Sequence, residues 1–285
     1  MSYSTLISAS ELAKHLHDPN WIIFDCRFSL ADEQAGQRAY RQVHIEGARY
    51  ADLNKDLSLA VKSYTGRHPL PNFAELANKL GAWGVNNRNQ IVVYDDTSGA
   101  FAGRMWWLLR CMGHTQVAVL DGGIKNWQKL GLPQTTVLPK ISASEFRSYL
   151  DNQQWLSAQQ VENGLASQSL MLIDARTPER FNGLQEPIDP VAGHVPKAIN
   201  RPFQLNLDSQ GLFLSAAQLR QQFSALTANR PAEQIVHMCG SGVTGCHNLL
   251  AMEVAGLSGS KLYAGSWSEW IVNPNREVAG VEKRK

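Results

Sequence analysis

The sequence of 285 residues contains an internal repeat. Four segments of the first half return in the same order in the second, at spacings between 143 and 150 positions. The pairs are WIIFDCR (21–27) with LMLIDAR (170–176), HIEGARY (44–50) with GHVPKAINRPF (193–203), IVVYDD (91–96) with IVHMCG (235–240), and LDGGIKNW (120–127) with YAGSWSEW (263–270). Repeats of this kind determine the architecture, so the chain is expected to fold as two homologous domains.

Each copy alternates short β-branched runs with helix-like segments such as 73–83 and 216–227. Apolar strands without alternation, separated by amphipathic helices, predict a parallel sheet with helices on both faces. The fold class is therefore α/β, with an N-terminal domain at 1–139 and a C-terminal domain at 152–285. The polar stretch after Pro139 is the expected linker.

Charge and cysteine content exclude several classes of function. The net charge is only +2 and the basic residues are scattered, which argues against a nucleic-acid partner. No apolar stretch approaches the roughly 20 residues needed to span a bilayer, and no secretion leader is recognisable, so a cytoplasmic chain without a membrane partner is expected. The four cysteines form no C-x-x-C pair and no Cys/His cluster, so we expect reduced thiols, no metal and no cofactor.

The two copies differ at the position where chemistry is expected. In open α/β sheets, ligands bind beyond the carboxyl ends of the strands, where loops lead into helices. The first copy has Asp95 there, and the second has Cys239 followed by glycines at 240, 242 and 245. Only the second copy can therefore carry thiol chemistry.

The loop after Cys239 has the composition of an anion site. Its glycines permit the positive φ angles that let successive N–H groups converge, with a helix N-terminus behind them. Such amides favour thiolate over thiol, which makes Cys239 the candidate nucleophile. The remaining cysteines, Cys26, Cys111 and Cys246, lie in apolar or helical stretches and are expected to be packing residues.

Two arginines, Arg176 and Arg180, follow the strand-like run that begins the second copy. They should therefore lie at the same edge of the sheet as Cys239. The planar fork of arginine binds both oxygens of a carboxylate, so either could hold an anionic substrate. The alternative is an exposed arginine or a salt bridge to Asp174.

Taken together, the tandem copies, the Cys-Gly-Ser-Gly-Val-Thr loop and the HIEGA, HVPKA, LDGGIKNW and GSWSEW segments resemble the two-domain rhodanese family. Within it they resemble the 3-mercaptopyruvate sulfurtransferases, because thiosulfate-preferring members place basic residues after the cysteine and this loop has none. The resemblance covers nearly the whole chain. It implies two rhodanese-like domains, of which only the C-terminal one is catalytic and forms a persulfide on its loop cysteine.

The resemblance also assigns roles to residues. It implies that Arg180 contacts substrate with Arg176 nearby, and that the loop around the persulfide is formed by Gly240, Ser241, Gly242, Val243 and Thr244. Ser241 would be linked to a first-domain histidine that His44 matches, although His44 as a buried structural histidine is the alternative. One departure is Ile188, which stands where mercaptopyruvate-type members often carry an arginine after Glu-Pro.

The predicted function is therefore transfer of sulfur from a small anionic donor, 3-mercaptopyruvate or thiosulfate, to cyanide or a thiol, the latter including a thioredoxin-like protein. A thiosulfate-preferring rhodanese is the nearest alternative. A cysteine phosphatase would need an arginine six residues after the cysteine, where this chain has Gly245. A non-catalytic binding module conflicts with the intact Cys239 loop.

Overall fold

The structure, a computed structural model, describes residues 2–280 and divides into two units. Unit 1 contains the residues up to Leu59, Leu70–Asn152 and Ser209–Phe213. Unit 2 contains Ala60–Pro69, Gln153–Asp208 and the residues from Leu214 onward. The repeat predicts one continuous half of the chain for each domain, and the structure differs from this prediction in the segments 60–69 and 209–213. Each belongs to the unit formed mainly by the other half of the chain.

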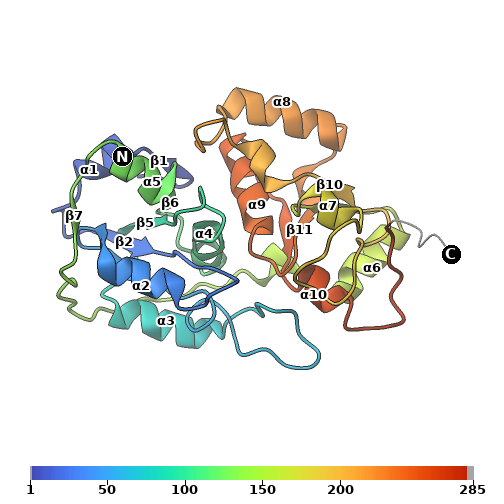
Figure 1. Ribbon diagram of the computed structural model, residues 1–285, viewed down its shortest axis with the longest axis horizontal. Coiled ribbons are helices and arrows are strands. Elements are labelled where there is room, and N and C mark those ends of the chain that lie inside the picture. Colours follow the sequence, from blue (N-terminus) through green and yellow to red (C-terminus); the bar gives the residue numbers. More distant parts are fainter. Residues whose placement is uncertain (1, 281–285) are drawn as a thin grey trace. The chain divides into compact units, whose positions relative to one another are not determined.

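Unit 1 is built on a five-stranded parallel sheet in the order β1-β6-β5-β2-β4 (Figure 1). Its strands are β1 (Leu6–Ile7), β2 (Trp21–Asp25), β4 (Arg49–Tyr50), β5 (Gln90–Tyr94) and β6 (Val117–Leu120). A separate antiparallel pair joins β3 (His44–Ile45) to β7 (Gln134–Thr135). Its helices are α1 (Ala9–Ala13), α2 (Ala35–Gln42), α3 (Phe73–Ala82), α4 (Ala102–Cys111) and α5 (Gly123–Lys129).

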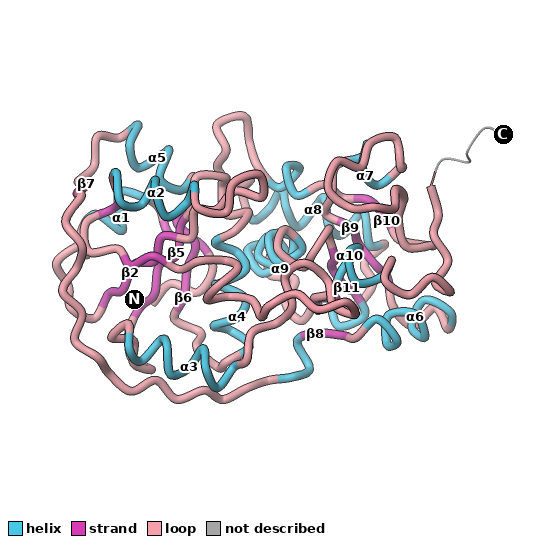
Figure 2. The backbone as a smooth tube through the Cα atoms, turned by 60° about the horizontal axis from the view of Figure 1, so that its bottom comes forward, coloured by secondary structure: helices cyan, strands magenta, loops and turns pink. Residues whose placement is uncertain are grey.

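Unit 2 repeats this plan with the strand order β10-β9-β11-β12-β8, again parallel. The strands are β8 (Trp155–Leu156), β9 (Met171–Asp174), β10 (Ile199–Asn200), β11 (Ile235–Met238) and β12 (Lys261–Tyr263). The helices are α6 (Ala158–Ala166), α7 (Pro178–Phe181), α8 (Ala216–Thr227), α9 (Gly245–Val254) and α10 (Ser266–Trp270), with 3-10 turns η1 (Asn152–Gln154), η2 (Phe203–Asn206) and η3 (Ala232–Gln234). Figure 2 shows the helices of each unit packed around its strands.

The two sheets correspond strand for strand, which confirms the predicted α/β class and the duplication. Each strand of the five-stranded sheet of unit 1 has a counterpart at the same place in the sheet of unit 2, with β5 matching β11 and β2 matching β9. The predicted helices at 73–83 and 216–227 are confirmed as α3 and α8. Local sequence explains where α8 begins, because Ser215 and Gln218 form a reciprocal capping box at its N-terminus.

The register of unit 2 brings two loops to one edge of the sheet. Strand β9 pairs with β11 so that Asp174 lies opposite Met238, and the N–H of Ala175 donates to the carbonyl of Met238 at 2.8 Å. The chain therefore leaves the sheet at neighbouring points, toward Arg176 after β9 and toward Cys239 after β11. Apolar side chains hold these strands in place, with Leu172, Val236, Met238, Trp267 and Trp270 in one buried cluster.

No helix within residues 2–280 is both long enough and apolar enough to cross a membrane.

Candidate active site

Cys239 lies directly after β11, at the start of the loop that leads into α9. Its side chain is buried, with the residue 3% exposed, and its Sγ accepts a hydrogen bond from the N–H of Val243 at 3.2 Å. Gly240, Gly242 and Val243 are buried with it, and Thr244 is the N-cap residue of α9. The predicted loop therefore forms, and one of its amides points at the sulfur.

Helix α10 holds the loop from the other side. The N–H of Trp267 donates to the carbonyl of Cys239 at 3.0 Å, and the N–H of Ser268 donates to the carbonyl of Gly240 at 2.9 Å. The N–H of Cys239 itself donates to the hydroxyl of Ser266 at 3.1 Å. These contacts satisfy the polar backbone groups of the loop and fix the direction of the Cys239 side chain.

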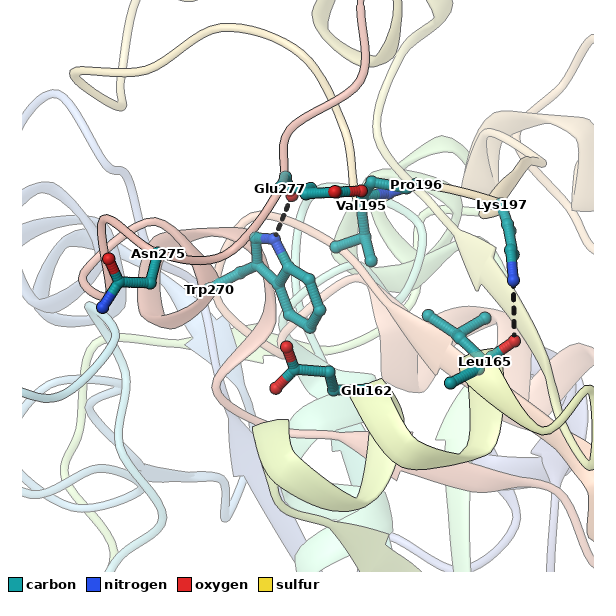
Figure 3. A pocket seen from close by; sticks show the side chains of 9 residues that line it. Glu162, Leu165, Val195, Pro196, Lys197, Trp270, Asn275 and Glu277 are labelled. Carbon is teal, nitrogen blue, oxygen red and sulfur yellow. Dashed lines mark hydrogen bonds between the residues drawn. The ribbon is translucent and has the colours of Figure 1, made fainter.

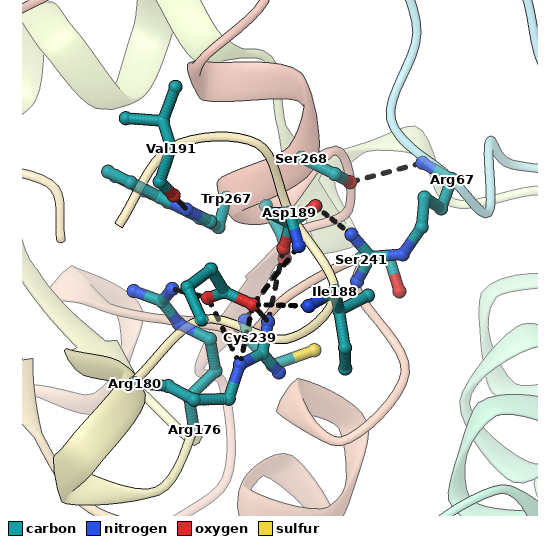
Figure 4. A network of polar contacts seen from close by, with 12 residues as sticks. Arg67, Arg176, Arg180, Ile188, Asp189, Val191, Cys239, Ser241, Trp267 and Ser268 are labelled. Atoms are coloured by element: carbon teal, nitrogen blue, oxygen red, sulfur yellow. Dashed lines mark hydrogen bonds and ion pairs between the residues drawn. The ribbon is translucent and has the colours of Figure 1, made fainter. Parts of the chain in front are cut away.

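Arg180, on α7, lies beside this loop, as the sequence analysis expects (Figure 4). A Cβ placed on Gly240 would lie 3.4 Å from its Nη2 and 3.5 Å from its Nη1. Its Nε and Nη2 donate to Glu186 and its Nη2 also donates to Asp189 at 3.1 Å, while Nη1 has no hydrogen bond within the described residues. Burial by itself would raise the pKa of Glu186. The hydrogen bonds from the Arg180 guanidinium and from two backbone amides outweigh burial and hold this pKa below its ordinary value.

The guanidinium of Arg176 is engaged in contacts within the protein, so the substrate-binding role that the resemblance implies for it remains a prediction. Its guanidinium donates to both carboxylate oxygens of Asp174, to the carbonyl of Gly193 at 2.8 Å and to Glu186, and its side chain is 1% exposed. It also stacks over the ring of Trp267, 4.8 Å from the centroid. Each of its three nitrogen atoms makes at least one of these contacts, which agrees with the alternative, a salt bridge to Asp174.

Unit 1 contains the same ion pair, although Asp95 stands there in place of the nucleophile Cys239. Arg27 follows Asp25 as Arg176 follows Asp174, and its Nη2 donates to Asp25 and to the carbonyl of Val43, both at 2.6 Å. A contact that is repeated in the copy without a nucleophile belongs to the architecture. This comparison supports the structural role of Arg176.

The histidine next to the loop serine is His68, not His44. The Nδ1 of His68 lies 2.7 Å from the Oγ of Ser241, and both residues are buried. His44 lies on β3 in unit 1, where its Nδ1 contacts the carbonyl of Tyr40 at 2.7 Å and its Nε2 that of Val137 at 3.2 Å. The structure therefore places His68 instead of the candidate His44 at Ser241, and the contacts of the buried His44 agree with the structural role that was the alternative.

His68 reaches this position because segment 60–69 belongs to unit 2. The segment is attached to α10 through the N–H of Arg67, which donates to the hydroxyl of Ser268 at 3.0 Å. Gly66 allows the close approach, since a Cβ there would lie 2.6 Å from the carbonyl of Gly265. Sequence reasoning missed both basic residues because they come from the first half of the chain.

The loop of unit 1 is closed by its own side chain. Asp95 occupies the place of Cys239, and its carboxylate accepts hydrogen bonds of 2.7–2.9 Å from four backbone amides, those of Thr97, Gly99, Phe101 and Ala102. Asp95 is fully buried. The anion position of the first copy is therefore filled by the protein itself.

Nothing in the described residues suggests another centre. Within residues 2–280 there is no group of three His, Cys, Asp or Glu side chains placed to hold a metal ion. A hollow of about 280 Å³ between α6 and α10 is lined by Leu165, Val195, Trp270 and the charged Glu162 and Lys197 (Figure 3). It contains no nucleophile and shares no lining residue with the Cys239 loop, so we assign the chemistry to the loop.

Comparison with known proteins agrees with this geometry. The model of the rhodanese-like domain matches residues 8–130 and again 157–273. The chain is 48% identical over 281 residues, covering 98% of this chain and 99% of the relative, to a probable 3-mercaptopyruvate sulfurtransferase of Pseudomonas aeruginosa. It is 38% identical over 280 residues, 96% of each chain, to a putative thiosulfate sulfurtransferase of Mycobacterium tuberculosis. Among solved structures, the 3-mercaptopyruvate sulfurtransferase of Escherichia coli matches with a TM-score of 0.80 at 29% identity, covering 94% of this chain and 100% of that one.

The chain therefore belongs to the rhodanese family, with one rhodanese-like domain in each half. Within that family it is a sulfurtransferase, as its relatives are.

Proposed function

We propose that the chain transfers sulfur from 3-mercaptopyruvate to a nucleophilic acceptor through a persulfide on Cys239. The observation that carries the choice of donor is the contact between Ser241 Oγ and His68 Nδ1 at 2.7 Å, beside the nucleophile. The relative from Pseudomonas aeruginosa, named a probable 3-mercaptopyruvate sulfurtransferase, supports the same donor.

The proposed first step is attack of the Cys239 thiolate on the donor sulfur. A sulfur–sulfur bond forms, the carbon–sulfur bond of the donor breaks, and its electron pair leaves on the enolate of pyruvate. The enolate then needs one proton to become pyruvate. The loop amide of Val243, which already contacts Sγ, would stabilise negative charge on the persulfide.

In this proposal the pair of Ser241 and His68 provides that proton, which the contact between their side chains supports. The serine hydroxyl would protonate the enolate carbon while His68 replaces the proton on Oγ, as in other hydroxyl–imidazole pairs. A thiosulfate donor would not need this help, because sulfite leaves as a stable anion. The pair is therefore a feature that distinguishes the two donors.

In the second step an acceptor such as cyanide or a thiol removes the outer sulfur and regenerates the Cys239 thiolate. A thioredoxin-like protein as acceptor and a location in the cytoplasm, both expected from the sequence, remain predictions. No metal or organic cofactor enters this scheme.

The persulfide is tested by intact-mass analysis after incubation with 3-mercaptopyruvate. The wild type should gain the mass of one sulfur atom, and Cys239→Ser should gain none. The assignment of the nucleophile is overturned if both proteins gain sulfur equally.

The donor is tested by comparing His68→Asn with the wild type, with cyanide as acceptor and thiocyanate as the measured product. Loss of a positioned acid–base group lowers turnover by about 10²- to 10⁴-fold, and we expect that loss with 3-mercaptopyruvate only. Thiosulfate turnover, for which no proton is needed, should be the internal control.

The second candidate is a thiosulfate-preferring rhodanese, which the 38% identical relative from Mycobacterium tuberculosis favours by its name. In that case His68→Asn would slow both donors to the same extent or neither. A higher kcat/KM for thiosulfate than for 3-mercaptopyruvate in the wild type would also favour this candidate.

A further inference from the structure

The hollow of about 280 Å³ in unit 2, between α6 and α10, has walls of mixed character (Figure 3). Leu165, Val195 and Trp270 belong to the buried apolar cluster of this unit. Glu162 and Lys197 bring opposite charges to the same walls. Pockets that bury drug-sized ligands measure about 300–1,000 Å³, so this hollow suits a smaller molecule.

Glu162 has no acidic counterpart in unit 1. Helices α1 and α6 begin at equivalent N-cap serines, 149 positions apart, and this spacing pairs Glu162 with Ala13. Ala13 packs against the apolar cluster that contains Trp127, whereas Glu162 places a carboxylate beside Trp270 (Figure 3). The ion pair of Glu162 with Arg276 is 3.8 Å long, which is too far for a hydrogen bond, so the carboxylate oxygens can still accept one.

Lys197 also departs from the first copy. At the spacing of 150 positions that relates His44 to His194, it pairs with Gly47. Both residues have left-handed φ angles, +67° for Lys197 and +77° for Gly47. Glycine adopts this conformation freely, but it is unfavourable for a residue with a Cβ, and such strain is found most often at functional sites. The second copy therefore keeps a lysine where glycine would avoid the strain.

The ammonium group of Lys197 lies at the end of α6. Its Nζ donates to the carbonyl of Leu165 at 3.2 Å, in the last turn of the helix. An ammonium group has three N–H donors, so this contact leaves donors for a ligand. Figure 3 shows Lys197 and Glu162 apart from each other on the walls of the hollow, and within the described residues they form no ion pair together. The hollow therefore offers one positive and one negative group at separate places.

We propose that this hollow binds a free α-amino acid with an apolar side chain. The carboxylate of the ligand accepts hydrogen bonds from Lys197, its ammonium group donates to Glu162, and its side chain packs against Trp270 and Val195. A ligand with both charges fits better than a simple anion or cation, because each of those would leave one charge of the hollow without a partner. The inference is independent of the proposed function, since the hollow shares no lining residue with the Cys239 loop.

The test is calorimetric titration of the full chain with L-leucine, L-methionine and L-valine. At least one of them should bind with a Kd below about 10 mM, and failure of all three overturns the proposal. Lys197→Gly and Glu162→Ala each restore the residue type of the first copy. Each should raise the Kd about 10- to 100-fold, the range for losing a hydrogen bond between charged groups. A Kd unchanged within about twofold in either variant also overturns the proposal.

Gln168→Gly is the matched control for the backbone change in Lys197→Gly. Gln168 also has a left-handed φ, +59°, and lies just after α6, but it does not line the hollow. Its substitution should leave the Kd unchanged, and a loss equal to that of Lys197→Gly would refute the role of the ammonium group. Urea unfolding should show that Lys197→Gly is folded, because Gly47 occupies the same turn in unit 1.

Two analogues of the amino acid show which of its groups each residue binds, and for leucine these are leucinamide and 4-methylpentanoate. Leucinamide lacks the carboxylate, so Lys197→Gly should leave its Kd unchanged. The second analogue lacks the ammonium group, so Glu162→Ala should leave its Kd unchanged. If Lys197 only caps α6, its substitution would affect leucine and leucinamide alike, and the proposal fails.

Discussion

Gly242 is the position where a single methyl group should disrupt the active-site loop. It has a φ of +75°, and a Cβ there would lie 2.1 Å from the carbonyl oxygen of Ala264. That oxygen belongs to the backbone after β12, so it cannot rotate away as a side chain would. Gly242→Ala must therefore strain the loop and push it away from β12.

The expected loss of stability has two parts. The left-handed conformation costs about 1–2 kcal/mol for a residue with a Cβ. Relieving the contact with Ala264 is an overpacking problem of about 1–3 kcal/mol, so the free energy of unfolding should fall by about 2–5 kcal/mol in total. The next residue carries the amide that contacts Sγ at 3.2 Å. Displacing such a donor should slow persulfide formation about 100-fold.

The control is Gly256→Ala in the same unit. Gly256 has a similar φ of +70°, but its Cβ would meet only Arg220 Nη1 at 3.3 Å, the end of a flexible side chain. The free energy of unfolding of Gly256→Ala should fall only by the roughly 1–2 kcal/mol that the left-handed backbone costs. Its rate of persulfide formation should stay unchanged. Urea unfolding measures the free energy of unfolding, and a time course of the mass assay measures the rate of persulfide formation. Equal losses in the two variants would refute the argument that Gly242 is required for close approach.

Two further predictions concern buried groups outside the loop. Burial, helped by Arg201, lowers the pKa of His237 to about 3, so the unfolded chain takes up a proton below about pH 6.5 that the folded chain does not. Stability should therefore fall by about 1.4 kcal/mol per pH unit as the pH drops from there toward the folded value, and His237→Phe should lack this slope in urea unfolding. Arg27→Met leaves Asp25 buried without its cation and should lower the free energy of unfolding by about 3–5 kcal/mol. Its KM for 3-mercaptopyruvate should stay unchanged, and a raised KM would contradict the purely structural role of this ion pair.

The duplication predicts the fold well because each copy satisfies the same local rules. Apolar runs become β2, β5, β9 and β11, and the capped amphipathic segment becomes α8. The duplication gives a wrong prediction of function when a residue present in both copies is assigned a catalytic role. His44 has a counterpart in His194, and both stack on an aromatic ring of their own unit while Nδ1 contacts a backbone carbonyl at 2.7 Å. Their presence in both copies is a sign of architecture.

The positions that do not repeat carry the functional candidates. At the spacing of 149 positions that relates β2 to β9, Arg180 corresponds to Ala31. At the spacing of 143 that relates the N-cap residues of α3 and α8, Arg67 and His68 correspond to Gln210 and Gly211. The comparison that separates Cys239 from Asp95 would thus have singled out Arg67 and His68 as well. The sequence alone does not place them beside Cys239, because that depends on segment 60–69 belonging to unit 2.

The closed loop of unit 1 explains why the fold tolerates a nucleophile in unit 2. Where a strand ends in converging backbone N–H groups before a helix, negative charge is stabilised, whichever residue follows the strand. In unit 1 the Asp95 carboxylate occupies this anion position, and its two oxygens accept hydrogen bonds from four backbone amides. Within the described residues, the Sγ of Cys239 accepts one amide hydrogen bond, from Val243, so its charge is met by fewer donors than that of Asp95. The same backbone design therefore gives a sealed copy when the tip is a carboxylate and a reactive one when it is a thiol.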